Sequence, residues 1–108
     1  MGEPIGMARK YFRISEIVKI CGVDEAFVKR LERESVIRAI NSQNRKLYSL
    51  DQVDRVRVAR LLIKEMGVNL EGAEVVLHMR EQMIAMQRQL KELVSLLSEI
   101  QSLGKRRT

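Results

Sequence analysis

Three cationic side chains within five residues are the part of this sequence whose types and spacing best suit a chemical task. Arg33 follows Arg30 by three positions and Lys29 by four, and these spacings bring side chains close together on a helix. Such a cluster can pair with phosphates, and its cations can also reach guanine edges. Because Glu32 and Glu34 are interleaved with it, a merely solvated charged face is an equally good interpretation of this segment alone.

Catalytic or metal chemistry has little support in the sequence. The chain contains one cysteine, Cys21, and one histidine, His78. A single thiol builds neither a disulfide framework nor a metal cluster, so we interpret Cys21 as a core residue and His78 as a surface or interface residue. A Gly-rich phosphate loop and clustered carboxylates are also missing, so we expect no enzyme activity, no metal and no cofactor.

The charge balance favours an anionic partner. The 108 residues carry 20 Lys and Arg against 14 Asp and Glu, a net charge of +6. Residues 1–66 hold 14 basic and 9 acidic groups, so the surplus is concentrated there. This distribution is compatible with nucleic acid or an acidic protein. Neither a signal peptide nor an 18-residue apolar run is visible, so we expect a cytoplasmic, nucleoid-associated protein without a membrane span.

A helix must present the cations, and the sequence predicts one over residues 24–34. Asp24 suits the N-cap, because its carboxylate can accept a backbone N–H group of the first turn. Phe27, Val28 and Leu31 recur at helical spacing and form an apolar stripe. The helix can therefore pack on a small core through one side while its cations meet a polyanion.

A second short helix is predicted directly before it, from Ile14 to Cys21. We expect Ser15 as its N-cap and Gly22 at its end, since glycine adopts the left-handed conformation at little cost. Only Gly22 and Val23 separate this helix from Asp24. Two short helices joined by a tight, Gly-containing turn are the helix-turn-helix pattern.

A small hairpin is predicted next. Residues 41–44 are turn-forming and lie between two apolar stretches, which indicates two short strands. Arg38, Arg45 and Lys46 fall near its tip, and such a hairpin beside a helix-turn-helix is a wing. Its basic side chains can bind phosphates or enter a minor groove. Arg13, ahead of the first helix, can touch a further phosphate.

A third helix is predicted after the hairpin. Residues 49–52 have the pattern of a capping box, with serine at the N-cap and glutamine three positions later. We expect Leu61 and Met66 to belong to the apolar side of this helix. Gly67 is predicted to end it, and Asn69 to cap the helix that follows.

The C-terminal segment carries a regular apolar repeat that alternates steps of three and four residues. These are the a and d positions of a coiled coil. A helix over this repeat would be roughly 37 Å long, more than the small N-terminal domain can cover. A second copy of the chain is the simplest partner, and folding back within one chain is the alternative. The predicted dimerisation residues are Val76, Met79, Met83, Met86, Leu90, Leu93, Leu97 and Ile100.

The order of these elements resembles the MerR family of transcriptional regulators. The matching segments are SEIVKICGVDEAFVKRLERESVI, a wing closing at KLYSLDQV, then GVNLEGAEVVL and the terminal heptads. The last segment before the heptads is most similar to the heat-shock repressor (HspR-type) branch and the chaperone-modulator (CbpM-type) proteins. The resemblance covers about residues 11–100. It implies a winged helix domain, a homodimer formed by an antiparallel coiled coil, and a dyad-symmetric DNA operator.

Single residue roles are also implied by the resemblance. Lys29 falls where the family usually has a DNA-contacting arginine, and Lys46 and Tyr48 fall where it has the arginine and tyrosine of the wing. Arg30 and Leu31 stand where the family often has two aromatic residues. The recognition surface therefore differs from the usual one but stays cationic.

The sequence thus predicts a mainly α fold, a winged helix-turn-helix domain with a C-terminal coiled-coil dimerisation helix. The expected parts are a flexible basic arm (1–10), the winged helix domain (11–77), the dimerisation helix (78–103) and a basic tail (104–108). The expected function is that of a dimeric, sequence-specific transcriptional regulator of double-stranded DNA without a small-molecule effector domain, and the resemblance implies chaperone or heat-shock genes as targets. The alternative is a protein-binding modulator of a J-domain co-chaperone. The candidate DNA-contacting residues are Arg13, Lys29, Arg30, Arg33, Arg38, Arg45, Lys46 and Tyr48.

Overall fold

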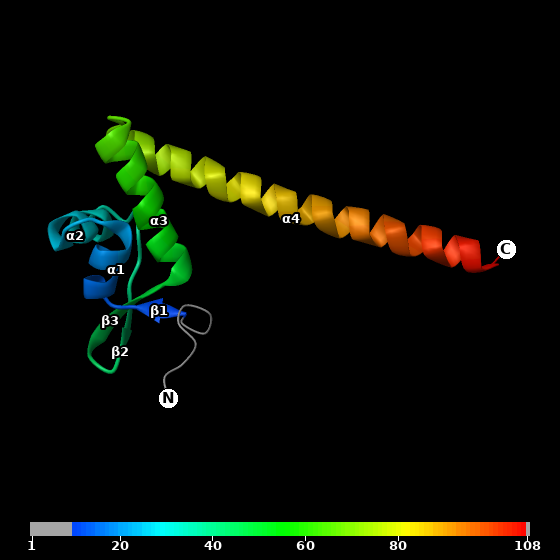
Figure 1. Ribbon diagram of the computed structural model, residues 1–108, viewed down its shortest axis with the longest axis horizontal. Coiled ribbons are helices and arrows are strands. Elements are labelled where there is room, and N and C mark those ends of the chain that lie inside the picture. Colours follow the sequence, from blue (N-terminus) through cyan, green and yellow to red (C-terminus); the bar gives the residue numbers. More distant parts are fainter. Residues whose placement is uncertain (1–9, 108) are drawn as a thin grey trace. The chain divides into compact units, whose positions relative to one another are not determined.

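The computed structural model describes residues 10–107 and is shown in Figure 1. The elements in chain order are β1 (Tyr11–Phe12), α1 (Ile14–Cys21), α2 (Glu25–Arg33), β2 (Ile40–Ser42), β3 (Arg45–Ser49), α3 (Leu50–Arg60), the π-helical turn η1 (Leu61–Glu65) and α4 (Leu70–Arg107). The predicted mainly α fold, with a small sheet and a long C-terminal helix, is confirmed. Apart from Lys10, the basic arm predicted for residues 1–10 lies outside the described residues.

The chain divides into two compact units, with the boundary between Glu74 and Val75. The first unit holds the sheet and the helices α1 to α3, and the second consists of the larger part of α4. None of the helices described between residues 10 and 107 is long and apolar enough to cross a membrane.

The predicted first helix is confirmed, but it begins one residue earlier than its expected cap. Arg13 is the N-cap instead of Ser15, and its backbone N–H donates to the Glu16 carboxylate at 2.9 Å. Glutamate at the third helical position thus satisfies the cap backbone, so no serine hydroxyl is needed there. Gly22 ends the helix at φ 66° and ψ 42°, and its N–H donates to the Val18 carbonyl at 3.0 Å. The predicted left-handed glycine is therefore present.

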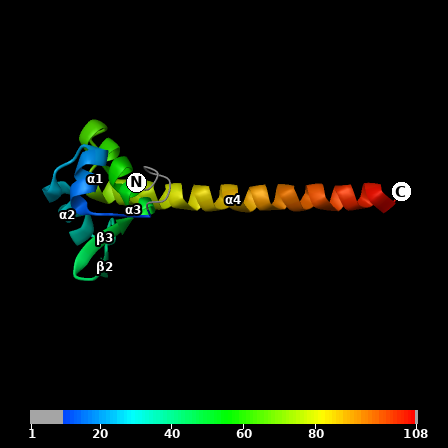
Figure 2. The same ribbon diagram turned by 60° about the horizontal axis from the view of Figure 1, so that its bottom comes forward.

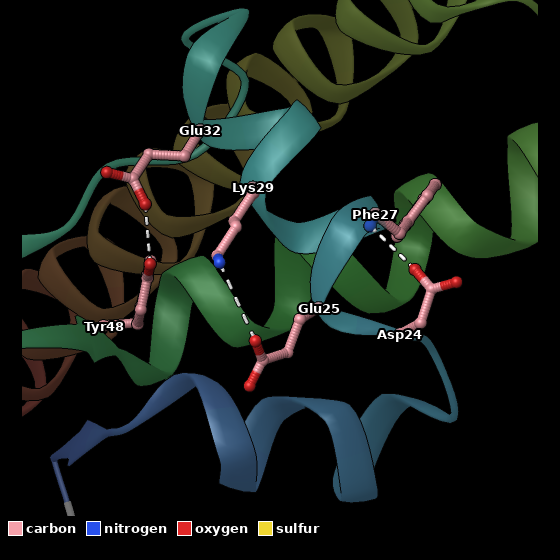
Figure 3. A network of polar contacts seen from close by, with 6 residues as sticks. All are labelled: Asp24, Glu25, Phe27, Lys29, Glu32 and Tyr48. Atoms are coloured by element: carbon pink, nitrogen blue, oxygen red, sulfur yellow. Dashed lines mark hydrogen bonds and ion pairs between the residues drawn. The ribbon is translucent and has the colours of Figure 1, made fainter.

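The cap and the apolar stripe of α2 are as predicted. The backbone N–H of Phe27 donates to Asp24 Oδ1 at 2.8 Å, as Figure 3 shows. Phe27, Val28 and Leu31 are buried. Helix α1 packs against both α2 and α3, and its Ile17 is fully buried in the core of the first unit. The helix-turn-helix is thus held through its apolar side, which leaves the other side of α2 to solvent.

The wing is a three-stranded antiparallel sheet in the order β1-β3-β2. Its hairpin turn is shorter than predicted, because only Gln43 and Asn44 lie outside the strands, at φ 52° and 64°. Two successive residues at positive φ suit the twist of a two-residue hairpin, a conformation that asparagine tolerates better than most residues. Figure 2 shows the β2–β3 hairpin extending away from α1 and α2. The edge strand β1, which pairs Phe12 with Tyr48, was not predicted.

The capping box predicted for α3 is wrong. Ser49 does occupy the N-cap, but its side chain caps no backbone group. The Gln52 carboxamide instead accepts the backbone N–H of Arg38 at 2.8 Å. Two residues further along α3, Arg55 Nε donates to the Val36 carbonyl at 2.7 Å. Both side chains are thus used to hold the segment that leads into the wing.

The expected apolar side of the third helix is also corrected near its end. Leu61 and Met66 are exposed, whereas Val58 and Ala59 are buried. The helix widens into the π-helical turn η1, in which the Met66 N–H donates to the Leu61 carbonyl five residues earlier. A wider turn changes which residues face the core, so a regular helical period fails there.

Helix α4 begins as predicted, because the N–H of Gly72 donates to Asn69 Oδ1 at 2.8 Å. It continues through residues 104–107 of the predicted basic tail. The eight predicted dimerisation residues, from Val76 to Ile100, are all exposed in the single chain. Dimerisation through them stays a prediction.

Candidate nucleic-acid interface

Helix α2 presents the predicted cationic cluster to solvent. Lys29, Arg30 and Arg33 are exposed, and they lie on the side of the helix opposite the buried stripe of Val28 and Leu31. The two sides follow directly from the helical period, since residues three or four apart share a side. The apolar stripe therefore fixes the direction in which the cations point.

Lys29 has a weak partner on its own helix. Its Nζ lies 3.8 Å from Glu25 Oε2, one turn earlier, and both side chains are exposed (Figure 3). Exposed pairs of this kind contribute about 0.3–0.5 kcal/mol, so a phosphate can replace the carboxylate at small cost. Within residues 10–107, neither Arg30 nor Arg33 pairs with a carboxylate.

The other predicted cations, Arg13, Arg38 and Arg45, are exposed as well, but they lie outside α2. Arg38 is positioned through its backbone by Gln52, ahead of β2. Arg45 begins β3, paired with Ser42 beside the hairpin turn. Arg13 is exposed at the start of α1. These three residues thus lie in three different segments around the helix-turn-helix.

Two residues of the wing, Lys46 and Tyr48, contact α2 directly. The Nζ of Lys46 donates to Glu32 Oε2 at 2.8 Å, and the hydroxyl of Tyr48 donates to the other oxygen, Oε1, at 2.6 Å. Figure 3 shows the carboxylate of Glu32 reaching from α2 to the Tyr48 hydroxyl. Because Glu32 lies one turn from Lys29 on α2, the ammonium group of Lys46 lies beside the cationic side of that helix, paired with a carboxylate.

Tyr48, predicted as a DNA contact, is the one candidate that is not exposed. Its side chain is 1% exposed and belongs to the core of the first unit. Burial, followed by the hydrogen bond to Glu32, raises its pKa well above the ordinary value. The hydrogen bonds from Lys46 and Tyr48 lower the pKa of Glu32, so this carboxylate is charged at neutral pH. The direct DNA contact of Tyr48 stays a prediction.

Glu32 was not identified from the sequence as a functional residue. It could be seen only as an acidic residue interleaved with cations. Its partners lie 14 and 16 residues away in the chain, so no local spacing connects them. The available signal was the alternation of Lys46 and Tyr48 on one side of a predicted strand, since residues two apart share a side.

The cations of α3 and η1 are committed to internal partners. Arg57 pairs with Asp54 and Arg60 with Glu65, each at 2.8 Å. Lys64 lies over the Phe27 ring, 5.1 Å from its centroid. These residues therefore contribute less to a phosphate-binding surface than the cations of α2.

Arg55 differs from them because it is partly buried. Burial lowers its pKa, and the neighbouring positive charge of Arg38 lowers it further. Its guanidinium donates to the Val36 carbonyl, which anchors the segment between α2 and the wing.

Cys21 lies in the core, as expected. Its Sγ donates to the Val53 carbonyl at 3.6 Å, and burial raises the pKa of the thiol. In the part of the chain that the structure describes, no group of three or more His, Cys, Asp and Glu side chains is arranged to hold a metal ion.

A helix-turn-helix with a β-wing and a solvent-facing row of cations defines the chain as a winged helix protein. The model of the MerR HTH family of regulatory proteins matches residues 12–95. The chain therefore belongs to the MerR family of helix-turn-helix regulators, as its sequence pattern predicted. Comparison with curated proteins gave no match. Its placement in the heat-shock repressor or chaperone-modulator branch stays a prediction.

Proposed function

We propose that this MerR-family protein is a sequence-specific transcriptional regulator that binds duplex DNA as a homodimer and catalyses no reaction. One observation carries the proposal: the exposed cations of α2 are backed by a buried apolar stripe, and Lys46 of the wing lies beside them. The MerR family match supports the same reading, because this is a family of helix-turn-helix regulatory proteins.

In this proposal, α2 is the recognition helix and enters the major groove. Arg30 and Arg33, which are free of carboxylate partners in the described chain, contact phosphates and guanine edges. Lys29 exchanges its weak pair with Glu25 for a phosphate. Arg38 and Arg45 bind the backbone beside the groove.

The homodimer in this proposal forms through α4. Its heptad positions from Val76 to Ile100 are apolar and exposed in the single chain. Exposed apolar rows of this length are uncommon on monomers and mark interaction surfaces. An antiparallel pair of such helices would cover both rows, and the dimer would read a dyad-symmetric operator. Chaperone or heat-shock genes are the proposed targets.

The test is the salt dependence of DNA binding. In the double variant Lys29→Ala, Arg30→Ala, the slope of log K against log salt should be flatter by about 0.9 for each phosphate contact that is lost. The matched control is Arg57→Ala with Lys91→Ala, which also removes two positive charges but leaves α2 and the wing intact. Equal slopes for both double variants would refute the assignment of α2.

A selection from a random duplex pool would test specificity and dimer symmetry together. If the protein binds DNA as a symmetric dimer, the selection should enrich fragments that carry two inverted half-sites. If the wild-type protein binds no duplex of any sequence in dilute buffer, the proposed function is wrong, and modulation of a J-domain co-chaperone becomes the alternative to pursue.

A further inference from the structure

The carboxylate of Glu32 lies in the proposed DNA-binding surface, where a negative charge opposes phosphate binding. It is nevertheless held in place by two donors from the wing. The ammonium group of Lys46 lies at 2.8 Å from one carboxylate oxygen. The hydroxyl of Tyr48 donates to the other at 2.6 Å, and Figure 3 shows this second contact. Each of its two carboxylate oxygens thus accepts from a different wing residue.

The two ends of the Lys46–Glu32 pair differ in exposure. The Lys46 side chain is 60% exposed, whereas that of Glu32 is 24% exposed. Glu32 also keeps its bond to the buried Tyr48 hydroxyl, so the carboxylate is the fixed partner. Lysine has a flexible four-carbon stem and three donors, so Lys46 is the partner that can turn to another anion.

We propose that Glu32 is a positioning residue that determines specificity: it holds Lys46 in an internal ion pair, and Lys46 transfers to a DNA phosphate only when α2 and the wing dock together. This inference rests on the proposed function and concerns the same surface. Its consequence is that Lys46 contributes little to the binding of arbitrary DNA.

The energetic balance follows from the pair being partly exposed. Such pairs contribute little to stability, so a well-placed phosphate can displace the carboxylate. A phosphate that lies too far from Lys46 to replace the carboxylate gains little, because the Lys46–Glu32 pair has no net charge. The negative charge of Glu32 also repels that phosphate at short range. Arg30 and Arg33 have no such restraint within the described residues and bind phosphates of any sequence.

Counterion release provides a measurable signature. A cation that was unpaired in the free protein adds about 0.9 to the salt slope when it binds a phosphate. When Lys46 leaves Glu32, the carboxylate is left without its cation and attracts a cation from solution. The contribution of Lys46 to the wild-type slope should therefore be much smaller than that of a full contact.

The decisive variant is Glu32→Gln. The carboxamide oxygen still accepts the Tyr48 hydroxyl, but the side chain no longer pairs with the Lys46 charge. On a duplex of arbitrary sequence, its salt slope should be steeper than that of the wild type by about 0.9 per protomer. A tenfold drop in salt should then strengthen its binding roughly eightfold more than that of the wild type, for each protomer bound.

The matched control is Glu65→Gln. It makes the same change in charge and removes the carboxylate partner of one cation, Arg60, whose side chain is 37% exposed. The pair has the same length but lies at the end of α3, outside α2 and the wing. If Glu65→Gln steepens the slope as much as Glu32→Gln does, net charge alone explains the effect and the inference is overturned.

A second variant, Lys46→Gln, tests the inference from the other member of the pair. In the wild-type background, Lys46→Gln should flatten the salt slope by less than half of the value expected for one full phosphate contact. In the Glu32→Gln background, Lys46→Gln should remove the whole increase in slope that Glu32→Gln causes. A loss of about 0.9 in the wild-type background would overturn the inference. If Lys29→Ala with Arg30→Ala flattens the slope but Glu32→Gln has no effect, the proposed function stands and only the role of Glu32 is wrong.

Discussion

Replacing Tyr48 by phenylalanine removes one hydroxyl group from the core and keeps every carbon atom of the side chain. The ring is 1% exposed, and the hydroxyl donates to the charged Glu32 at 2.6 Å. Hydrogen bonds to charged groups contribute about 1.5–3 kcal/mol. Because Glu32 is partly exposed and retains Lys46, we expect the lower part of this range, a loss of about 1.5–2 kcal/mol in the free energy of unfolding.

The measurement is denaturant unfolding followed by circular dichroism, at equal protein concentrations, because the midpoint of a dimer depends on concentration. For a domain of this size the midpoint of thermal unfolding should fall by roughly 6–16 °C. Tyr11→Phe is a matched control, since Tyr11 is the other tyrosine of the chain and is 46% exposed. Its effect should stay within about 0.5 kcal/mol. An equally small effect of Tyr48→Phe would refute the structural role of this hydrogen bond.

The pH dependence of the same variant has a defined sign. The pKa of Glu32 is lowered in the folded protein, mainly by the hydrogen bonds from Lys46 and Tyr48. The contribution of the charged Glu32 to the free energy of unfolding is therefore complete above the pKa of about 4.3 that the residue has in the unfolded chain. This contribution is lost as the pH falls through the lower pKa of the folded protein. The pKa of Tyr48 is raised, so the hydroxyl keeps its proton up to the unfolded value of about 10 and beyond. The difference in the free energy of unfolding between wild type and Tyr48→Phe should stay constant from about pH 5 to pH 9 and become smaller below pH 5. A difference that grows in acid would contradict this assignment.

Two further variants test the remaining parts of the chain. Leu90→Asp places a charge in the middle of the apolar row of α4, so sedimentation at micromolar concentration should change from about twice the monomer mass to the monomer mass. Ser95→Asp, on the same helix but outside the row, should leave the dimer intact, and a wild-type monomer would remove the argument for a dyad-symmetric operator. Gly22→Ala should cost about 1–2 kcal/mol in unfolding experiments, because φ is 66° there although a Cβ would meet no atom within 4 Å. An unchanged stability would show that the turn relaxes to another conformation.

The features that the sequence determined by itself are those with short-range causes. Asp24 caps α2 because its carboxylate reaches an N–H three residues later, and Gly22 ends α1 because glycine adopts its positive φ without strain. The apolar stripe of α2 and the apolar row of α4 follow from the helical period, which is set by the backbone alone. The direction in which the α2 cations face is a consequence of the same period.

The tertiary structure decided the features whose partners are distant in the chain. Gln52 had the position of a helix-capping residue, but packing places the Arg38 backbone within its reach. Glu32 was one acidic residue among cations until the fold of the wing brought Lys46 and Tyr48 to it. A side chain with several possible partners takes the one that the packed core holds nearest, and a local pattern carries no information about that distance.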